Sequence, residues 1–137
     1  SSIAFVAEYE GKRVLFGADA HPGVLLGSLK RAPLGKDSLP LKAFKLPHHA
    51  SKNNVSREMI AAFPAEHYLV STNGQQFGHP DEEAIARILT VHKQSAKTLH
   101  FNCPSEFNSV WNSISHQNSW NYDAHYGTNS DGLVVDL

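Results

Sequence analysis

The chain has 137 residues, with 12 lysines and arginines against 13 aspartates and glutamates, 9 histidines and 41% apolar residues. This length fits one domain with a buried core, so we treat residues 1–137 as a single segment. A formal charge of −1 argues against binding nucleic acid through a bulk positive field. No apolar run approaches the roughly 18 to 20 residues of a membrane helix, and no signal peptide is visible. The single cysteine, Cys103, excludes an internal disulfide framework.

The first third of the chain predicts a hairpin followed by a helix. Residues 3–9 and 12–17 are typical of strands, with a tight turn at residues 10–11 between them. A helix is expected from Pro22, because proline is favourable in a first helical turn. The polar stretch 33–41, which begins with a proline, predicts the loop that ends this helix.

The middle of the chain predicts strands that alternate with helices, which is typical of the α/β class. A short strand over residues 41–46 ends abruptly at a Pro-His-His sequence, and a short helix follows from about Ser56. Another strand is expected at residues 68–71. The next helix starts at Pro80, where carboxylates also follow near the positive helix end.

The last third predicts a strand at residues 98–101, then an amphipathic helix, then a closing strand at residues 132–137. The helix is predicted because Phe107, Val110, Trp111 and Ile114 are spaced at i, i+3, i+4 and i+7. Turn residues are richest at 127–132, directly before the predicted closing strand.

Polar clusters follow three of the predicted strands, at residues 17–21, 47–52 and 77–80. In open α/β folds ligands collect at the loops beyond the carboxyl ends of strands. The clusters contain a carboxylate and several imidazoles, and zinc accepts both kinds of ligand. They therefore predict a metal site.

Each of these residues also has a simpler interpretation. Asp19 is either a metal ligand or a cap for the helix near Pro22. For the pair His48-His49, the alternatives are metal binding or one solvated and one hydrogen-bonded histidine. Consecutive strand residues point to opposite faces, so both rings reach one metal only if the backbone turns there. His79 is either a pocket residue or simply the residue before a helix.

Ser51 and Lys52 follow the histidine pair directly. A hydroxyl and an ammonium beside a metal suit a phosphate or carboxylate substrate, although a solvated turn is the more common arrangement. Cys103 is expected to be a small core residue. Five other histidines show no ligand spacing and are interpreted as surface or core-edge residues: His67, His92, His100, His116 and His125.

Taken together, these motifs resemble the C-terminal half of the metallo-β-lactamase fold. The nearest branch contains the hydrolase domain of bacterial DNA-uptake (competence) channel proteins. The likeness rests on the hairpin ending in Asp19, on the sequence FKLPHHASK at residues 44–52, on VSTN at 70–73 with FGHP at 77–80, and on the closing strand. It covers nearly the whole chain.

The resemblance implies roles for particular residues. An aspartate at the position of Asp19 bridges two metal ions in that family, and a histidine of the His-His element ligates one of them. We assign that histidine to His49, with His48 as the alternative, and His79 matches a histidine near the substrate pocket. Ser51 and Lys52 are the remaining expected substrate contacts. The implied cofactor is zinc in a two-metal site, with manganese or iron as alternatives.

Two departures from the family pattern shape the prediction. Ala50 stands where the family usually has glycine, so the turn must avoid positive φ or bear a strain cost. The family's main metal motif, His-x-His-x-Asp-His, is absent from these residues, and a catalytic zinc site needs about three protein ligands. We therefore expect half of an αββα sandwich that is inactive alone. The Ser-Ser start also suggests a piece of a longer protein.

The expected parent is a metal-dependent hydrolase acting on a phosphoester, ester or amide bond, and the alternative is a non-catalytic binding or dimerisation module. An uncovered sheet face is unusual in a monomer, so the N-terminal half of the domain or a second copy is expected to cover it. The expected substrate is a small molecule or a phosphodiester; relatives also cleave nucleic acids, which the charge here does not indicate. The absence of a visible signal and the free cysteine favour the cytoplasm.

Overall fold

The computed structural model describes residues 2–32 and 37–137, and it begins with the expected hairpin. Strands β1 (Phe5–Tyr9) and β2 (Lys12–Phe16) pair antiparallel. Glu10 and Gly11 form the turn, both with positive φ (49° and 76°), as tight two-residue hairpin turns require. The predicted loop at residues 33–41 lies partly outside the described residues, because residues 33–36 are not among them.

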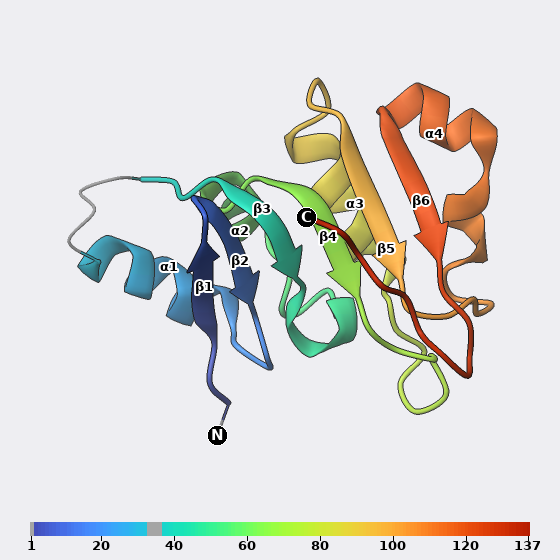
Figure 1. Cartoon of the computed structure of the whole chain (residues 1–137), viewed down its shortest axis with the longest axis horizontal. Coiled ribbons are helices and arrows are strands. Elements are labelled where there is room, and N and C mark those ends of the chain that lie inside the picture. Colours follow the sequence, from blue (N-terminus) through green and yellow to red (C-terminus); the bar gives the residue numbers. More distant parts are fainter. Residues whose placement is uncertain (1, 33–36) are drawn as a thin grey trace.

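Five strands after β1 run parallel to one another and make one mixed sheet in the order β1-β2-β3-β4-β5-β6 (Figure 1). The later strands are β3 (Leu41–Lys45), β4 (Ala65–Val70), β5 (Lys97–Phe101) and β6 (Tyr122–Tyr126). The helices between them are α1 (Pro22–Arg31), α2 (Arg57–Ala62), α3 (Glu82–Val91) and α4 (Ile114–Trp120). The predicted α/β class, with one mixed sheet and flanking helices, is confirmed.

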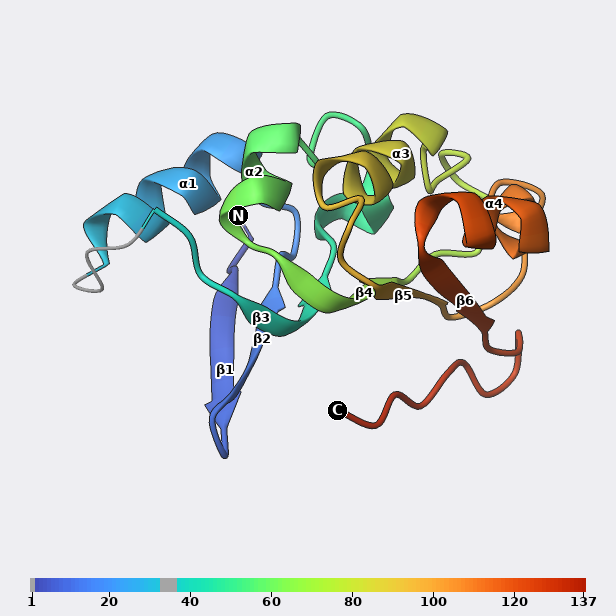
Figure 2. The same ribbon diagram turned by 90° about the horizontal axis from the view of Figure 1, so that it is seen from above.

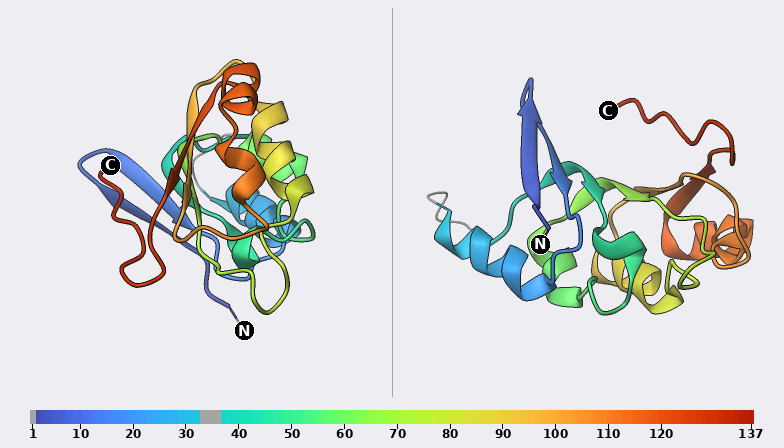
Figure 3. Two further views of the ribbon diagram at one scale, coloured as in Figure 1. Left: turned by 90° about the vertical axis from the view of Figure 1, so that its right-hand side faces the viewer. Right: turned by 90° about the horizontal axis from the view of Figure 1, so that it is seen from below.

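All four helices lie on the same side of the sheet (Figure 2). Alternate strand residues point to this covered face, and one register row across β2 to β5 is fully buried there: Leu15, Phe44, Tyr68 and Leu99. Within residues 2–32 and 37–137, no helix lies on the opposite, open face (Figure 2). The β1–β2 hairpin and residues 133–137 project on that side (Figure 3). This one-sided arrangement is consistent with half of an αββα sandwich.

The closing strand is not where the sequence predicted it. The last strand is β6, directly after α4, whose end at Asn121 is left-handed (φ 55°). Residues 133–137 are extended but pair with no described strand, and their end is held by a hydrogen bond from Lys12 Nζ to the Leu137 carbonyl (2.6 Å). The prediction at residues 132–137 was wrong because β6 had already filled the place beside β5.

The predicted helix over residues 107–114 is also wrong in its bounds. A short 3₁₀ turn (Ser109–Asn112) is followed by α4, and the extended backbone of Ser113 separates them. The Ser113 hydroxyl accepts the His116 N–H and so caps α4. Phe107 lies outside both elements and packs against the loop after β4. Trp111 and Cys103 are buried, as predicted.

Because β2 to β6 are parallel, their carboxyl ends meet at one edge of the sheet, where the arrowheads point in Figure 1. The loops after β2, β3 and β4 contain the three predicted polar clusters, and this edge holds the candidate site. Among the described helices, none has both the length and the apolar character needed to cross a membrane.

Candidate functional site

The chain reverses sharply after β3 in a short turn, Pro47–Ala50, which we call the histidine turn. His48, His49 and Ala50 all adopt positive φ, at 43°, 57° and 63°. The turn is held by the His48 N–H, which donates to the Ala18 carbonyl at 2.7 Å. The backbone turn that the sequence required for both rings to share a site is therefore present.

Ala50 confirms the expected strain at this turn. Its φ of 63° lies in the left-handed region that glycine adopts freely and alanine does not, at a cost of the order of 1 to 3 kcal/mol. The residue is fully buried, and its carbonyl accepts the Asp81 N–H at 3.1 Å. Tertiary contacts therefore stabilise a backbone conformation that the local sequence disfavours, and strained positions of this kind cluster at functional sites.

The His48 ring is oriented by the buried side chain of Asn54. Asn54 Nδ2 donates to the carbonyls of Ala20 (3.1 Å) and Asp19 (3.3 Å), so its Oδ1 faces the His48 ring at 3.1 Å from Nδ1. An amide oxygen only accepts hydrogen bonds, so Nδ1 carries the proton. When this ring is neutral, its Nε2 therefore presents a lone pair.

His49 is oriented in the same way by a different partner. Its Nδ1 lies 2.5 Å from the Ser71 carbonyl oxygen in the loop after β4, and a carbonyl can only accept. When His49 is neutral, its Nε2 therefore also has a lone pair available to a metal ion. Histidines that ligate metals commonly donate their other ring N–H to a carbonyl or a carboxylate, and both rings show this arrangement.

A third imidazole, His79, joins the first two. Its ring centroid lies 5.7 Å from that of His48, and its Nδ1 lies 3.4 Å from Asp81 Oδ1. The carboxylate of Asp81 is itself fixed, since Oδ2 accepts the Lys52 N–H at 2.7 Å. His49 and His79 line one cavity of about 280 Å³, which we call the imidazole pocket.

Asp19 lies on the loop after β2, whose Ala18 carbonyl accepts the His48 N–H, but Asp19 lines a different cavity from the imidazole pocket. It does not cap α1, because the N-cap residue is His21, so the simpler interpretation of Asp19 is not supported. Asn54 links its main chain to the His48 ring through the bonds described above. The exposed carboxylate also acts on Lys45, whose pKa is lowered by burial and partly restored by the Asp19 charge.

Ser51 and Lys52 adjoin the histidine turn, but their contacts are local. Ser51 is buried and closes the next turn, with its carbonyl accepting the N–H of Asn54. The Lys52 ammonium contacts the Glu83 carboxylate on α3 at 3.4 Å. Their role as substrate contacts stays a prediction.

The donor set fits zinc in kind but falls short in number. Imidazole nitrogen and carboxylate oxygen are accepted zinc ligands, and the orientation of His48 and His49 suits ligation. Within residues 2–32 and 37–137, however, no group of three or more histidines, cysteines or acids is placed to hold a metal ion. The described part of the chain provides only some of the ligands that a catalytic zinc needs.

Three further histidines gather on the open face, although the sequence indicated no site for them. His67, His100 and His125 lie on β4, β5 and β6, and we call them the histidine row. His67 Nδ1 lies 3.0 Å from His100 Nε2, and the rings of His100 and His125 are 5.2 Å apart. Burial, with smaller effects from the two neighbouring rings, lowers the pKa of His100 to about 4.

Several residues that organise the site carried little signal in the sequence. Asp81 was interpreted only as part of a helix start, although its carboxylate faces the His79 ring at 3.4 Å. Asn54 contacts partners 34 and 35 residues away, and no local pattern predicts such contacts. The histidine row had a partial signal, because each member falls in a strand, but the strand that carries His125 was itself missed.

The fold and the site define an α/β protein with a one-sided mixed sheet and an imidazole cluster at its carboxyl edge. Comparison with protein-family models, curated proteins and solved structures finds no match for this chain. Its resemblance to the metallo-β-lactamase fold therefore stays a prediction.

Proposed function

We propose that the chain is the C-terminal half of a metal-dependent hydrolase with a metallo-β-lactamase-like fold, acting on a phosphoester, ester or amide bond. The observation that supports this most is the oriented histidine pair, His48 and His49. Both rings donate Nδ1–H to a protein oxygen and keep Nε2 for another partner, in a strained turn that Asn54 links to the main chain of Asp19.

In this proposal Asp19 and His49, or alternatively His48, hold metal at the sheet edge. Zinc fits these donors best, with manganese or iron as alternatives. When bound, such a metal lowers the pKa of its water to about 7 and supplies hydroxide at neutral pH. His79 lies at the pocket wall beside the Asp81 carboxylate, where its ring can take or return a proton from the reacting group.

The missing ligands must come from outside the described residues. The N-terminal half of the same domain would supply them, or a second copy would, and either would also cover the open face. Without that partner we expect the chain to be inactive. The net charge of −1 does not indicate a nucleic acid substrate, so a small molecule or a phosphodiester is the expected one.

The test measures bound metal and turnover in the full-length protein that contains this chain. Asp19→Asn and His49→Gln should each reduce zinc content and hydrolysis by more than about 100-fold, since even residues behind the ligands contribute 10- to 100-fold. Asp136→Asn, in the exposed C-terminal stretch, is the matched control and should change neither. Unchanged turnover in Asp19→Asn would contradict the proposal.

The second candidate is a non-catalytic binding or dimerisation module. It is favoured by the exposed apolar side chains of the hairpin, where Phe5 is 52% and Phe16 36% exposed and the two rings stack. A full-length protein that holds no metal but self-associates through this hairpin would support the module and reject the hydrolase.

A further inference from the structure

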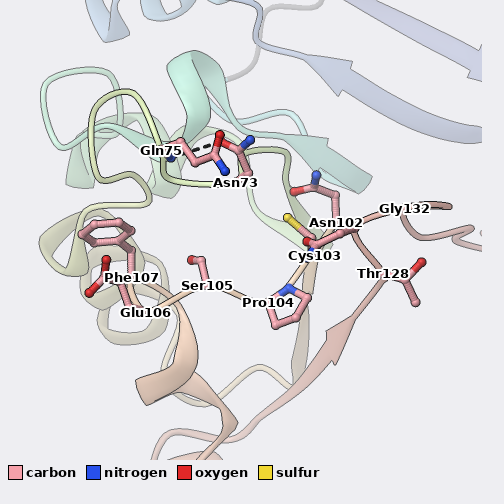
Figure 4. A pocket seen from close by; sticks show the side chains of 11 residues that line it. Asn73, Gln75, Asn102, Cys103, Pro104, Ser105, Glu106, Phe107, Thr128 and Gly132 are labelled. Atoms are coloured by element: carbon pink, nitrogen blue, oxygen red, sulfur yellow. Dashed lines mark hydrogen bonds between the residues drawn. The ribbon is translucent and has the colours of Figure 1, made fainter.

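A larger cavity, of about 660 Å³, lies at the carboxyl edge of β4, β5 and β6 (Figure 4). This volume falls in the range typical of small-molecule sites. We call it the amide cavity, because four side-chain amides line it: Asn73, Gln75, Asn102 and Asn129. The Glu106 carboxylate and the Phe107 ring also line this cavity.

The charge of this lining selects against anions. Glu106 is the only charged residue among those that line it, with no lysine, arginine or histidine. Phosphates and carboxylates are normally bound by cationic side chains, so the cavity does not suit them. Carboxamides both donate and accept hydrogen bonds. Such a lining fits an uncharged ligand that bears several hydroxyl groups.

Two of the amides are already oriented toward a ligand. Asn102 Oδ1 accepts the Thr72 N–H at 2.7 Å, and Asn73 Oδ1 accepts the Gln75 N–H at 3.1 Å. Because a main-chain N–H can only donate, these bonds identify which end of each amide is oxygen. The NH₂ groups of both residues are therefore the ends left to donate to a ligand.

The aromatic wall is equally preorganised. Phe107 packs against two glycines of the loop after β4. A Cβ atom at Gly74 would lie 2.4 Å from Phe107 Cδ2, and one at Gly78 would lie 3.1 Å from Cε1. Only residues without side chains leave room for the ring. The buried Asn108 braces the same segment by bonding to Cys103 and Ser105 (2.9 Å each). Binding therefore requires little reordering of this wall.

We propose that the amide cavity binds an uncharged sugar unit of the substrate, with Asn73 and Asn102 donating to its oxygens and Phe107 against its apolar C–H face. Asn73 lines both this cavity and the imidazole pocket, so the bond next to the sugar lies beside His49 and His79. That placement rests on the proposed function, whereas sugar binding itself does not.

The test is a titration of the ¹⁵N-labelled full-length protein that contains this chain with maltose and with N,N′-diacetylchitobiose, followed by the side-chain amide signals. We expect shifts at Asn73 and Asn102. Asn73→Asp and Asn102→Asp keep the oxygen that accepts the main-chain N–H but remove the donor, so each should weaken binding about 3- to 10-fold. Asn118→Asp, the same change at an exposed position of α4, is the control and should bind normally.

Three results would overturn the proposal: no amide shift with either disaccharide, equal affinity in Asn73→Asp, Asn102→Asp and the unmodified chain, or tighter binding of adenosine or glucose 6-phosphate than of both sugars. The Asp19→Asn variant separates this inference from the proposed function. Retained sugar binding together with unchanged hydrolysis in that variant would reject the metal site and leave the sugar site standing.

Discussion

The two faces of the sheet are built from the same strands, yet their central rows differ in chemistry. On the covered face the row through Phe44 and Tyr68 is apolar and fully buried. The residues one position earlier in each strand point to the open face. There Ala43 on β3 pairs with His67 on β4, and His67 pairs with Thr98 on β5. The helices lie on the side of the first row (Figure 2).

This difference shows where stability and chemistry are separated in the molecule. The covered face excludes water and contributes the hydrophobic free energy of folding. The open face keeps ionisable groups such as Lys45 and His100 partly or wholly buried, which lowers the pKa of each. Such groups cost stability unless they are neutral or paired, so they are better suited to recognition than to packing.

The largest expected effect on the free energy of unfolding comes from comparing two phenylalanines, one on each face of the sheet. Phe44→Ala removes a fully buried ring that contacts Phe63 and Tyr68, and it should lower the free energy of unfolding by about 3 to 5 kcal/mol. Phe16→Ala on the open face should cost only about 1 kcal/mol, because Phe16 is already 36% exposed. Urea denaturation measures both. Equal losses would show that the open face is packed as tightly as the covered one.

A second effect tests the histidine row through its pH dependence. His100 has a pKa of about 4 in the folded chain against about 6.5 when unfolded. Between pH 6.5 and pH 4 the unfolded chain therefore binds a proton at His100 that the folded chain does not bind. Stability should fall as the pH drops from 6.5 to 4, by at most about 3 kcal/mol, and it should level off below that.

The measurement is urea denaturation at several pH values between 7 and 4. His100→Gln is neutral throughout this range, so its unfolding free energy should lose most of the pH slope. His116→Gln, on α4, is the matched control and should keep the slope of the unmodified chain. The same slope in all three proteins would show that His100 titrates normally.

The smallest effect concerns the exposed part of the hairpin. Arg13 Nε donates to Glu8 Oε2 at 2.6 Å, and the two residues face each other across β1 and β2. Their side chains are 38% and 51% exposed, so Arg13→Met should change the free energy of unfolding by less than about 1 kcal/mol. High salt should remove what difference there is. A larger, salt-independent loss would mean that Arg13 supports the hairpin by packing.

Much of the fold was predictable from local signals. Alternating apolar residues indicated the inner strands, and Pro22 and the Pro80-Asp81 sequence marked the regions where α1 and α3 begin. Strand β6 was missed because its sequence, YDAHY, is short and half polar, while residues 132–137 are more apolar. Local hydrophobicity does not reveal which segment has a free place beside β5.

The candidate site was predictable in its members more than in its geometry. The spacing of polar clusters after strands indicated Asp19, the His48-His49 pair and His79. It did not indicate that Asn54 orients His48, because the Asn54 amide is itself oriented by carbonyls 34 and 35 residues away. It also did not indicate that the Asp81 carboxylate, two residues further along the chain, faces the His79 ring.

The α/β class, the hairpin turn and the position of polar residues after β2, β3 and β4 were predictable from side-chain pattern and local backbone preference. The left-handed turn at residues 48–50, the tautomer of His49 and the meeting of His67 with His100 depend on tertiary contacts. Those features require contacts between segments more than 20 residues apart, which stabilise conformations that each segment alone disfavours.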